Sequence, residues 1–234
     1  VDGKPIYTSG MSADDKYAAA KTAALGFFQA AGYTVENGKI TAAPEGAKMQ
    51  YEVQIPADGT GNHPSFMMVT EAKKALAEIG MDIVVTDLSD ATALWDGIRA
   101  RQVDMWCAAW NAPVDPDMYQ IYYADVADFN GDMGNGYNPM GGPDQGNSSY
   151  MYCVADEELD NMILEARKSL DQSYRKTLYK ACLDTIVDWA TEVPVYQRQN
   201  AIIFSTERVK METVLPDITT FYGWLNGIQN MELN

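Results

Sequence analysis

Two hydrophobic periods alternate along the first half of the chain. In residues 48–56 apolar side chains occupy every second position, which is typical of a strand with one buried face. In residues 63–80 they recur every three or four positions, which predicts a helix with one apolar stripe. Residues 81–88 are apolar almost throughout, as expected of a strand that is covered on both faces. A short helical pattern at 89–102 and an apolar strand at 103–110 complete the series.

This order of strand, helix, strand, helix and strand predicts two consecutive crossover units. Such units are right-handed and build a parallel sheet with helices packed on its faces. We therefore expect an α/β fold: a three-layer lobe with a mainly parallel sheet, mixed at its edge, and helices on both faces. Ligands of such sheets bind beyond the carboxyl ends of the strands. The loops that leave those ends, PADGTGN at 56–62 and NAPVDP at 111–116, are therefore the predicted functional rim.

The flanking segments are mostly helical. An alanine-rich helix is predicted at 12–33, and a small hairpin follows it around ENGK. Two amphipathic helices are predicted at 156–170 and 171–189, and a strand-like segment at 193–209. No internal repeat and no linker interrupts the pattern, so we expect residues 1–234 to form a single domain.

The acidic composition restricts the function. The 234 residues carry a formal net charge of −16, and such a surface repels nucleic-acid phosphates and anionic lipid headgroups. The apolar runs are all much shorter than the roughly 20 residues that span a bilayer. The start of the chain, VDGKPIYTSG, lacks the basic and apolar regions of a signal peptide. A mature protein, a cytosolic protein and an excised piece are the alternatives that this leaves.

The sequence offers few metal-binding or redox residues. His63 is the only histidine, and Cys107, Cys153 and Cys182 have no metal-ligand spacing, so we expect neither a metal site nor a cofactor. Cys107 and Cys153 are the one pair worth testing as a disulfide, although an unpaired thiol is favoured for each cysteine. We expect His63, at a predicted helix start, to cap the helix or lie on the surface, and no catalytic triad follows from it.

Two acids separated by one proline, Asp115-Pro116-Asp117, invite a catalytic interpretation. Proline is favoured at the first position of a helix and aspartate just before it, where the carboxylate accepts a free backbone N–H. Asp117 would then lie in the first turn, where the helix dipole favours an acid. We therefore favour a helix start over a pair of catalytic carboxylates, whose separation in space a sequence does not define.

Two further motifs are incomplete. The run DFNGDMGNG has acids at the spacing of a calcium loop, but Met133 replaces the glycine of its sharp turn and Pro139 stands in place of the bidentate glutamate. GTGNHP at 59–64 contains two glycines of a dinucleotide fingerprint, with Pro64 in place of the third. We interpret the first as a solvated loop, with a looser Ca²⁺ site as the alternative, and the second as a flexible loop of the rim.

Aromatic side chains are abundant, with 5 tryptophans and 14 tyrosines. Their rings combine apolar area with a polar group, which suits a ligand cleft. Some of them must fill the core, and Trp106 is expected to. Those that fall around the predicted rim are Trp106, Trp110, Tyr119, Tyr122, Tyr123, Tyr137, Tyr150 and Tyr152.

The ordered set of motifs resembles a known family. AALGFFQAAGYTVENGKI, TEAKKALAEIGMDIVVTDL, GIRARQVDMWCAAWNAPVDPDMY and the paired helices that lead to VPVY follow one another along the chain. This order is similar to that in the C-terminal lobe of the solute-binding proteins of ABC importers, in the oligopeptide-, dipeptide- and nickel-binding family. The likeness extends from about residue 14 to residue 209, and its strength lies in the order of the motifs.

The resemblance implies both a function and a missing part. Members of that family are periplasmic or lipoprotein carriers, longer than this chain, whose two lobes close on a ligand like a clamshell. It implies that residues 1–234 are the second lobe, and that an N-terminal lobe and ABC permease subunits are its partners. The ligand would be a peptide, bound outside the cytoplasm without catalysis. The ligand-binding residues that we expect are Phe66, Trp110, Asn111, Ala112, Pro113, Asp115, Tyr119, Tyr137 and Tyr150.

Two departures from the family pattern bear on the ligand. Where dipeptide- and oligopeptide-binding members commonly carry an aspartate for the ammonium group of the ligand, this chain has Ala112 or Pro113, with Asn111 the nearest polar residue. Where dipeptide binders carry an arginine for the carboxylate of the ligand, this chain has Phe66 and Met67. A longer or apolar peptide, held by backbone hydrogen bonds and aromatic packing, therefore fits better than a short zwitterionic one.

Two other functions are alternatives. A sensor or receptor domain of the same fold would present its ligand to a partner protein instead of a permease. A glycan-acting enzyme would use Asp115 and Asp117, or the acids of DFNGD, as its catalytic groups.

Overall fold

The computed structural model describes residues 5–110, 114–126, 151–197, 201–215 and 223–234. The chain divides into two compact units, Val1–Ala109 and Trp110–Asn234, and each is described by itself. The single domain that the sequence predicts stays a prediction. Five of the predicted ligand-binding residues lie outside the described residues: Asn111, Ala112, Pro113, Tyr137 and Tyr150.

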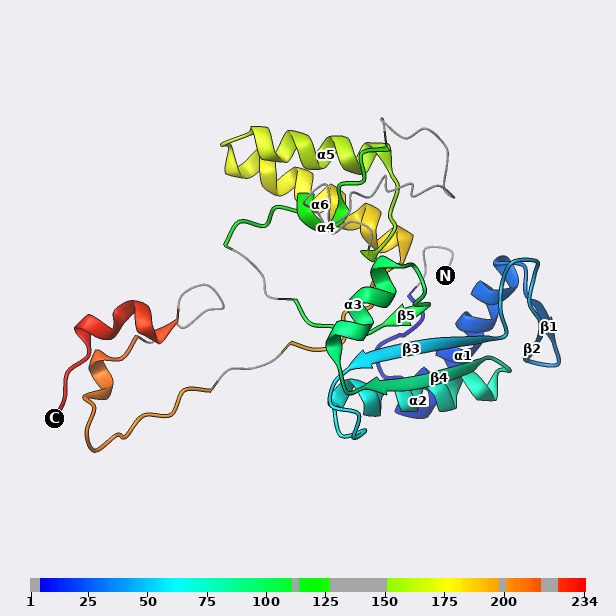
Figure 1. Ribbon diagram of the computed structural model, residues 1–234, viewed down its shortest axis with the longest axis horizontal. Coiled ribbons are helices and arrows are strands. Elements are labelled where there is room, and N and C mark those ends of the chain that lie inside the picture. The colour runs from blue at the N-terminus through cyan, green and yellow to red at the C-terminus, as the bar shows by residue number, and fades with distance from the viewer. Residues whose placement is uncertain (1–4, 111–113, 127–150, 198–200, 216–222) are drawn as a thin grey trace. The chain divides into compact units, whose positions relative to one another are not determined.

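The first unit is built on a three-stranded sheet (Figure 1). Strand β3 (Gln50–Pro56) lies in the middle and pairs along its whole length with β4 (Asp82–Leu88). On its other side it pairs briefly with β5 (Met105–Trp106). Both pairings are parallel, so the parallel sheet that the hydrophobic pattern predicts is confirmed.

Helices cover both faces of this sheet. α2 (Pro64–Glu78) connects β3 to β4, and α3 (Ala91–Arg99) leads from β4 past β3 to β5. The two crossovers run in opposite directions, and right-handed crossovers of that kind place their helices on opposite faces. Both helices contact β3 and β4 (Figure 1). The expected α/β lobe, with a parallel sheet between helices, is confirmed.

Alternate residues of β3 build the core of the first unit. Val53 and Ile55 are buried, and they pack with Ile83 of β4 and Val69 of α2. The side chains between them on β3 point to the opposite face, because successive strand residues alternate. This is the pattern that residues 48–56 predict.

The N-terminal part of the unit adds a helix and a hairpin. α1 (Ala13–Ala30) leads into two antiparallel strands, β1 (Thr34–Glu36) and β2 (Lys39–Ala42). The turn residues Asn37 and Gly38 both have positive φ, 51° and 72°, as the two-residue turn of a tight hairpin requires. The hairpin predicted around ENGK is therefore confirmed.

β5 is shorter than predicted. The apolar run at 103–110 predicts a longer strand, but only Met105 and Trp106 pair with β3. The amide of Cys107 donates one further hydrogen bond, to the carbonyl oxygen of Gln54 (2.9 Å). Because β5 has β3 as its partner on one side alone and β3 ends shortly afterwards, the ladder stops there.

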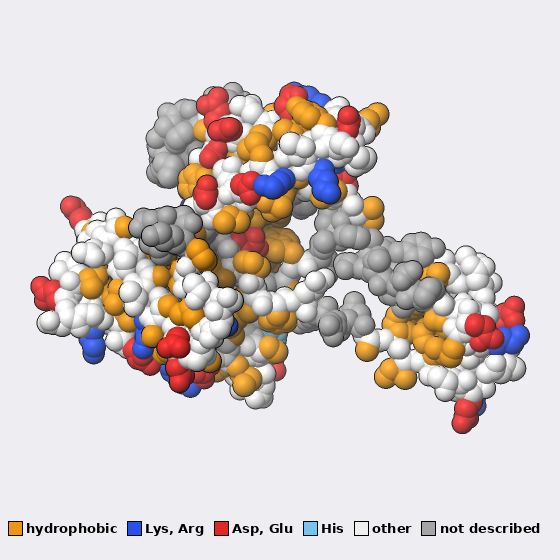
Figure 2. All heavy atoms as spheres, turned by 180° about the vertical axis from the view of Figure 1, so that it is seen from behind, with side chains coloured by type: hydrophobic (Ala, Val, Ile, Leu, Met, Phe, Trp, Pro, Cys, Tyr) orange, Lys and Arg blue, Asp and Glu red, His pale blue; other side chains and the backbone are white. Residues whose placement is uncertain are grey.

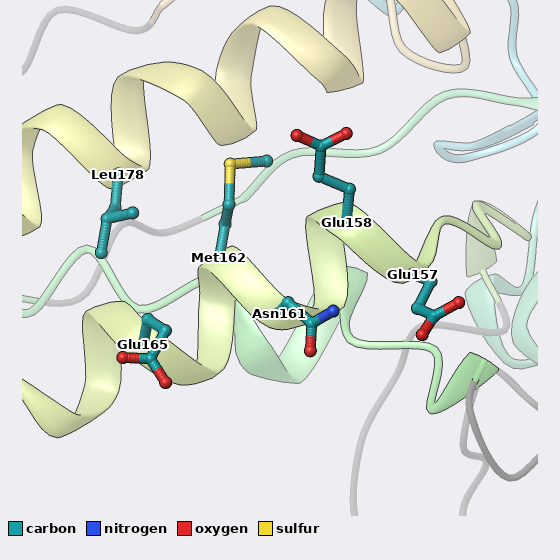
Figure 3. Close-up of a pocket in the computed structure, with 6 residues that line it drawn as sticks. All are labelled: Glu157, Glu158, Asn161, Met162, Glu165 and Leu178. Carbon is teal, nitrogen blue, oxygen red and sulfur yellow. The ribbon is translucent and has the colours of Figure 1, made fainter.

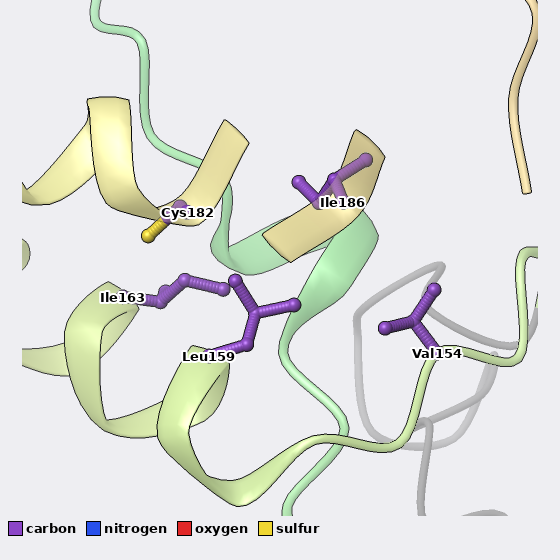
Figure 4. Packing of buried hydrophobic residues seen from close by; sticks show 5 residues of the cluster. All are labelled: Val154, Leu159, Ile163, Cys182 and Ile186. Atoms are coloured by element: carbon purple, nitrogen blue, oxygen red, sulfur yellow. The ribbon is translucent and has the colours of Figure 1, made fainter. Parts of the chain in front are cut away.

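The second unit is centred on two helices, α5 (Glu157–Lys168) and α6 (Gln172–Trp189). Asp156 and Asp171 cap them, each accepting a backbone N–H, so both predicted helix starts are confirmed. Cys107 and Cys182 are free thiols, and Cys182 is a core residue as predicted. The apolar cluster between the helices (Figure 4) consists of Val154, Leu159, Ile163, Cys182 and Ile186.

The helix that follows the Asp-Pro-Asp run begins later than predicted. α4 comprises Tyr119–Tyr122, and Asp117 accepts the amide N–H of Tyr119 (3.1 Å) just before it. Asp115 instead pairs with Arg175 of α6 (2.6 Å). The prediction that Asp115 caps this helix is therefore wrong, because an arginine from a distant part of the sequence takes its carboxylate.

The C-terminal segment has little regular structure. Residues 193–209 predict a strand, which is wrong for the described part of that stretch: Val209 alone is bridged there, to Leu233. Short 3₁₀ helices follow at Met211–Thr213 (η4) and Trp224–Asn230 (η5). A strand forms only beside a partner that satisfies its backbone groups. Figure 2 shows apolar side chains among acidic ones at the surface of the molecule. The exposed apolar residues of the C-terminal segment include Val193, Val195, Tyr196, Ile203, Leu225 and Leu233.

Candidate functional site

In the first unit the candidate surface is the carboxyl edge of the sheet. Because β3, β4 and β5 are parallel, the loops that follow them leave from the same edge. The loop after β3 is held in place there. Thr60 donates from its amide and its hydroxyl to Asp58 Oδ1 (2.9 and 2.6 Å), and the amide of Gly61 donates to Asp87 Oδ2 (2.8 Å). The hydrogen bonds from the Thr60 side chain and amide lower the pKa of Asp58, which favours the ionised carboxylate that accepts them.

Phe66 lies beside this loop. It is in the first turn of α2, whose N-cap His63 accepts the Ser65 amide on Nδ1 (3.2 Å), so the predicted capping role of His63 is confirmed. Phe66 is half-buried and packs, with Cys107, against the core of the first unit. A side chain on Gly61 would touch the Phe66 ring. Phe66 therefore borders the predicted rim, and its contact with a ligand stays a prediction.

Asp87, near the end of β4, is a residue of this edge that sequence reasoning missed. Its Oδ2 atom holds the loop, whereas its buried Oδ1 atom has no hydrogen-bond partner among the described residues. A buried oxygen of this kind normally has a partner, in the protein or in water. The available signal was an acid close to the end of an otherwise apolar strand.

In the second unit the candidate surface is formed by four side chains, which we call the Trp110 cluster: Trp110, Tyr122, Tyr152 and Glu192. The indole Nε1–H of Trp110 donates to the hydroxyl oxygen of Tyr152 (2.7 Å). Tyr152 donates to Glu192 Oε1 (3.0 Å), and Tyr122 donates to Glu192 Oε2 (2.7 Å). The two tyrosine rings are stacked, with centroids 5.4 Å apart and an angle of 18° between the planes.

The charges of the Trp110 cluster follow from burial. Burial raises the pKa of both tyrosines far above the usual value, and the neighbouring Glu192 raises it further. Both hydroxyls therefore stay protonated and donate hydrogen bonds to Glu192. Trp110 is 48% exposed, and Glu192 is exposed as well. The cluster thus presents a negative charge and aromatic surface to the solvent.

Trp110 is the one predicted ligand-binding residue in this cluster. Tyr122 and Tyr152 are among the aromatics expected around the rim, but Glu192 is a residue that sequence reasoning missed. It follows α6 in a stretch with no motif, and an exposed glutamate after a helix gives no signal that it will meet two tyrosines from distant segments.

Tyr119 is engaged by two neighbours. Its ring is stacked on that of Tyr123 (centroids 4.6 Å apart, 14° between planes), and the Arg167 guanidinium lies 4.0 Å from its centroid. Arg167 also pairs with Asp117, with 3.2 Å between Nε and Oδ2. The Tyr119 ring therefore helps to attach α4 to α5, and its contact with a ligand stays a prediction.

Asp115 and Asp117 are each held by a different arginine. Arg175, only 14% exposed at its side chain, pairs with Asp115 and donates to the hydroxyl of Tyr179 (3.2 Å). Asp117 pairs with Arg167, so the two carboxylates are bound to separate arginines. This arrangement favours a structural role for both acids.

A shallow groove of about 470 Å³ is lined by side chains of α5 and α6. Figure 3 shows acidic and amide side chains of α5 around it. It contains none of the residues that the sequence predicts for ligand binding. Its lining consists of Glu157, Glu158, Asn161, Met162, Glu165 and Leu178.

Two kinds of site are absent from the described residues, one for a metal ion and one for crossing a membrane by a helix. In that part of the chain no group of three or more histidine, cysteine, aspartate or glutamate side chains is arranged to hold a metal ion. Nor does any helix in it have the length and apolarity to cross a bilayer.

The fold matches solved structures of solute-binding proteins. The oligopeptide-binding protein of Thermus thermophilus, complexed with a pentapeptide, matches with a TM-score of 0.51 at 14% identity, over 83% of this chain and 32% of that protein. The oligopeptide-binding protein AppA of Bacillus subtilis, in complex with a nonapeptide, gives 0.50 at 12% identity, over 80% and 33%. The ABC transporter-associated periplasmic binding protein DppA of Helicobacter pylori, in complex with the peptide STSA, gives 0.50 at 15% identity, over 97% and 36%.

These matches define the class of fold. No protein-family model matches the sequence, and no curated protein matches it significantly. The chain has the fold of part of a periplasmic solute-binding protein, and it spans about one third of the length of the structures that it matches. The resemblance to one lobe of such a protein, which the order of the motifs implies, is therefore confirmed at the level of the fold.

Proposed function

We propose that this chain is the ligand-binding second lobe of a solute-binding protein of an ABC importer, and that its ligands are peptides. The observation that carries the proposal is the parallel sheet with its loops at one edge. Three binding proteins with a similar fold have structures in complex with a peptide. The lobe would act outside the cytoplasm, with an N-terminal lobe and the permease subunits as its partners.

The side chains favour an extended, largely apolar peptide. Phe66 borders the carboxyl edge of the sheet, and Trp110 exposes almost half of its surface. Aromatic residues of this kind supply apolar contact area with few freely rotating bonds, which keeps the entropic cost of binding low. Backbone groups of the rim loops would supply the remaining hydrogen bonds, which do not depend on the sequence of the peptide.

The ion pairs of Asp115 and Asp117 favour a binding function over a catalytic one. Asp115 and Asp117 are ion-paired with separate arginines, whereas a glycosidase needs two carboxylates placed on either side of one bond. Peptide bound to such a lobe would therefore be released unchanged.

Calorimetry of the 234-residue chain tests the proposal. Alanine-rich peptides of three, five and nine residues would be titrated, with maltose and free amino acids as non-peptide ligands. We expect measurable heat with the longer peptides and none with the sugar. Peptides that give no heat at any length, or sugar that binds more tightly than peptides, would contradict the proposal.

A tryptophan substitution localises the binding. We expect Trp110→Ala to weaken peptide binding by about tenfold or more, because an aromatic anchor at an interface commonly contributes over about 1 kcal/mol. Trp189→Ala is the matched control, since Trp189 is similarly exposed but belongs to α6 and donates to Asp156. Equal losses in the two variants would show that Trp110 has no special role.

A further inference from the structure

The Trp110 cluster contains a carboxylate whose hydrogen-bonding capacity is only partly used. Each oxygen of Glu192 accepts one tyrosine hydroxyl, from Tyr122 and from Tyr152. An ionised carboxylate can accept about four hydrogen bonds. Glu192 is exposed, so its remaining lone pairs are accessible to a donor from the solvent.

The negative charge of Glu192 has no basic partner within the described part of the chain. Other acids of this unit form ion pairs, such as Asp115 with Arg175 and Asp117 with Arg167. No lysine or arginine of the described residues pairs with Glu192. The two tyrosine donors orient the carboxylate but remain protonated, so they leave its charge in place.

Three aromatic side chains are linked to this charge through hydrogen bonds. The stacked rings of Tyr122 and Tyr152 and the half-exposed indole of Trp110 are joined to Glu192 by one continuous chain of hydrogen bonds. Aromatic faces attract cations through their quadrupole, most strongly for tryptophan. A carboxylate among such rings combines charge, hydrogen-bond acceptors and aromatic surface, which together select an organic cation over a hydrated metal ion.

We propose that the Trp110 cluster is a subsite for a primary alkylammonium group, with Glu192 as its counter-charge. The assignment of this group to a peptide rests on the proposed function. In a peptide, the group would be either the N-terminal ammonium or a lysine side chain. The three N–H donors of the ammonium would be shared between the free lone pairs of Glu192 and water, with the alkyl part against Trp110.

The first experiment uses n-butylammonium chloride and not a peptide. The side-chain N–H signal of Trp110 in the full chain, assigned with Trp110→Phe, would be followed by NMR during titration, with n-butanol as the neutral probe of the same shape. We expect a saturable shift with butylammonium alone. No saturable shift with butylammonium, or an equal one with butanol, would overturn the subsite.

Charge removal tests the role of Glu192 itself. Glu192→Gln keeps the shape and one acceptor for the tyrosines but removes the charge, and we expect it to weaken butylammonium binding by about tenfold or more. Glu212→Gln, an exposed glutamate of η4, is the matched control and should bind as the wild type does. Unchanged binding by Glu192→Gln, in a protein whose thermal transition matches that of the wild type, would overturn the assignment.

Three peptides then separate the two sources of the ammonium group: penta-alanine, its N-acetylated form, and the acetylated form with one lysine. Loss of affinity on acetylation assigns the subsite to the N-terminal ammonium, and recovery with lysine assigns it to a side chain. Equal affinity for all three, unaffected by Glu192→Gln, would overturn the subsite while leaving peptide binding intact. Butylammonium binding without any peptide binding would instead contradict the proposed function alone.

Discussion

Asp160 shows how one residue can organise a unit of this protein. It is the single buried charged residue in the described part of the chain, 5% exposed. Its two oxygens accept the amide N–H groups of Ala124 and Val126 (2.8 and 2.9 Å), which attaches the segment after α4 to α5. A hydrophobic pattern does not reveal this role, because Asp160 lies between the core residues Leu159 and Ile163 and breaks the stripe.

Replacing Asp160 with alanine should therefore destabilise the protein. The change leaves two amide groups without an acceptor in a buried or half-buried place, and we expect a loss of about 2–4 kcal/mol in the free energy of unfolding. Denaturant unfolding measures it. Glu165→Ala, on the exposed side of the same helix, should change the free energy by less than about 0.5 kcal/mol. A loss no larger than that of the control would contradict the role of Asp160.

The effect of Asp160 should also depend on pH. Burial raises the pKa of Asp160 above its ordinary value, although the Val126 and Ala124 amides oppose the shift. A raised folded-state pKa means that the folded protein holds this proton more tightly than the unfolded chain does. The stabilisation is therefore fully present below the unfolded pKa and declines as pH rises through the folded one. We expect the stability difference between wild type and Asp160→Ala to be larger in acid than at neutral pH; a difference that grows towards neutral pH would contradict this.

The residue scale is also where sequence reasoning misses most. Glu192, Asp87 and Asp160 gain their roles from neighbours that are distant in the sequence. Asp115 has a plausible local role as a helix cap, but Arg175, 60 positions further along, takes its carboxylate. Local rules describe what a side chain can do, and the tertiary partner decides what it does.

At the scale of elements the hydrophobic pattern is a better guide. The strand–helix series of the first unit has the predicted order and parallel direction, since period and connection length together leave few alternatives. The predictions that are wrong concern strands that lack a pairing partner. β5 is short because it has a single neighbour in the sheet. Residues 193–197 have no strand beside them among the described residues.

Gly80 joins two of these elements, between α2 and β4, and gives an element-scale prediction. Its φ is +92°, and a side chain there would overlap the backbone oxygen of Ile40 in β2. We expect Gly80→Ala to cost about 2–5 kcal/mol in the free energy of unfolding, from backbone strain and from overlap.

Gly10 supplies the matched control for this substitution. Its φ is +90°, but nothing lies within 4 Å of an added side chain. Gly10→Ala should therefore cost only the strain, about 1–2 kcal/mol. Equal losses in the two variants, measured by denaturant unfolding, would show that the approach of Ile40 has no energetic effect.

At the scale of the whole molecule, the fold class and the likeness to solute-binding proteins could be predicted from the order of the motifs, because that order reflects the topology. The ligand could not, because it depends on the exact placement of rim side chains. The chain spans only about a third of the proteins that it matches. A lobe that provides part of the contact area should bind more weakly than a closed clamshell.

The proposed function requires that this chain bind a peptide and release it unchanged. NMR of the full chain during titration with a nonapeptide, followed by mass spectrometry of the recovered peptide, tests it most directly. We expect signal shifts at the loop after β3, at Phe66 and at Trp110, and an intact peptide after prolonged incubation. Shifts confined to α1 and the β1–β2 hairpin, or a cleaved peptide, would contradict it.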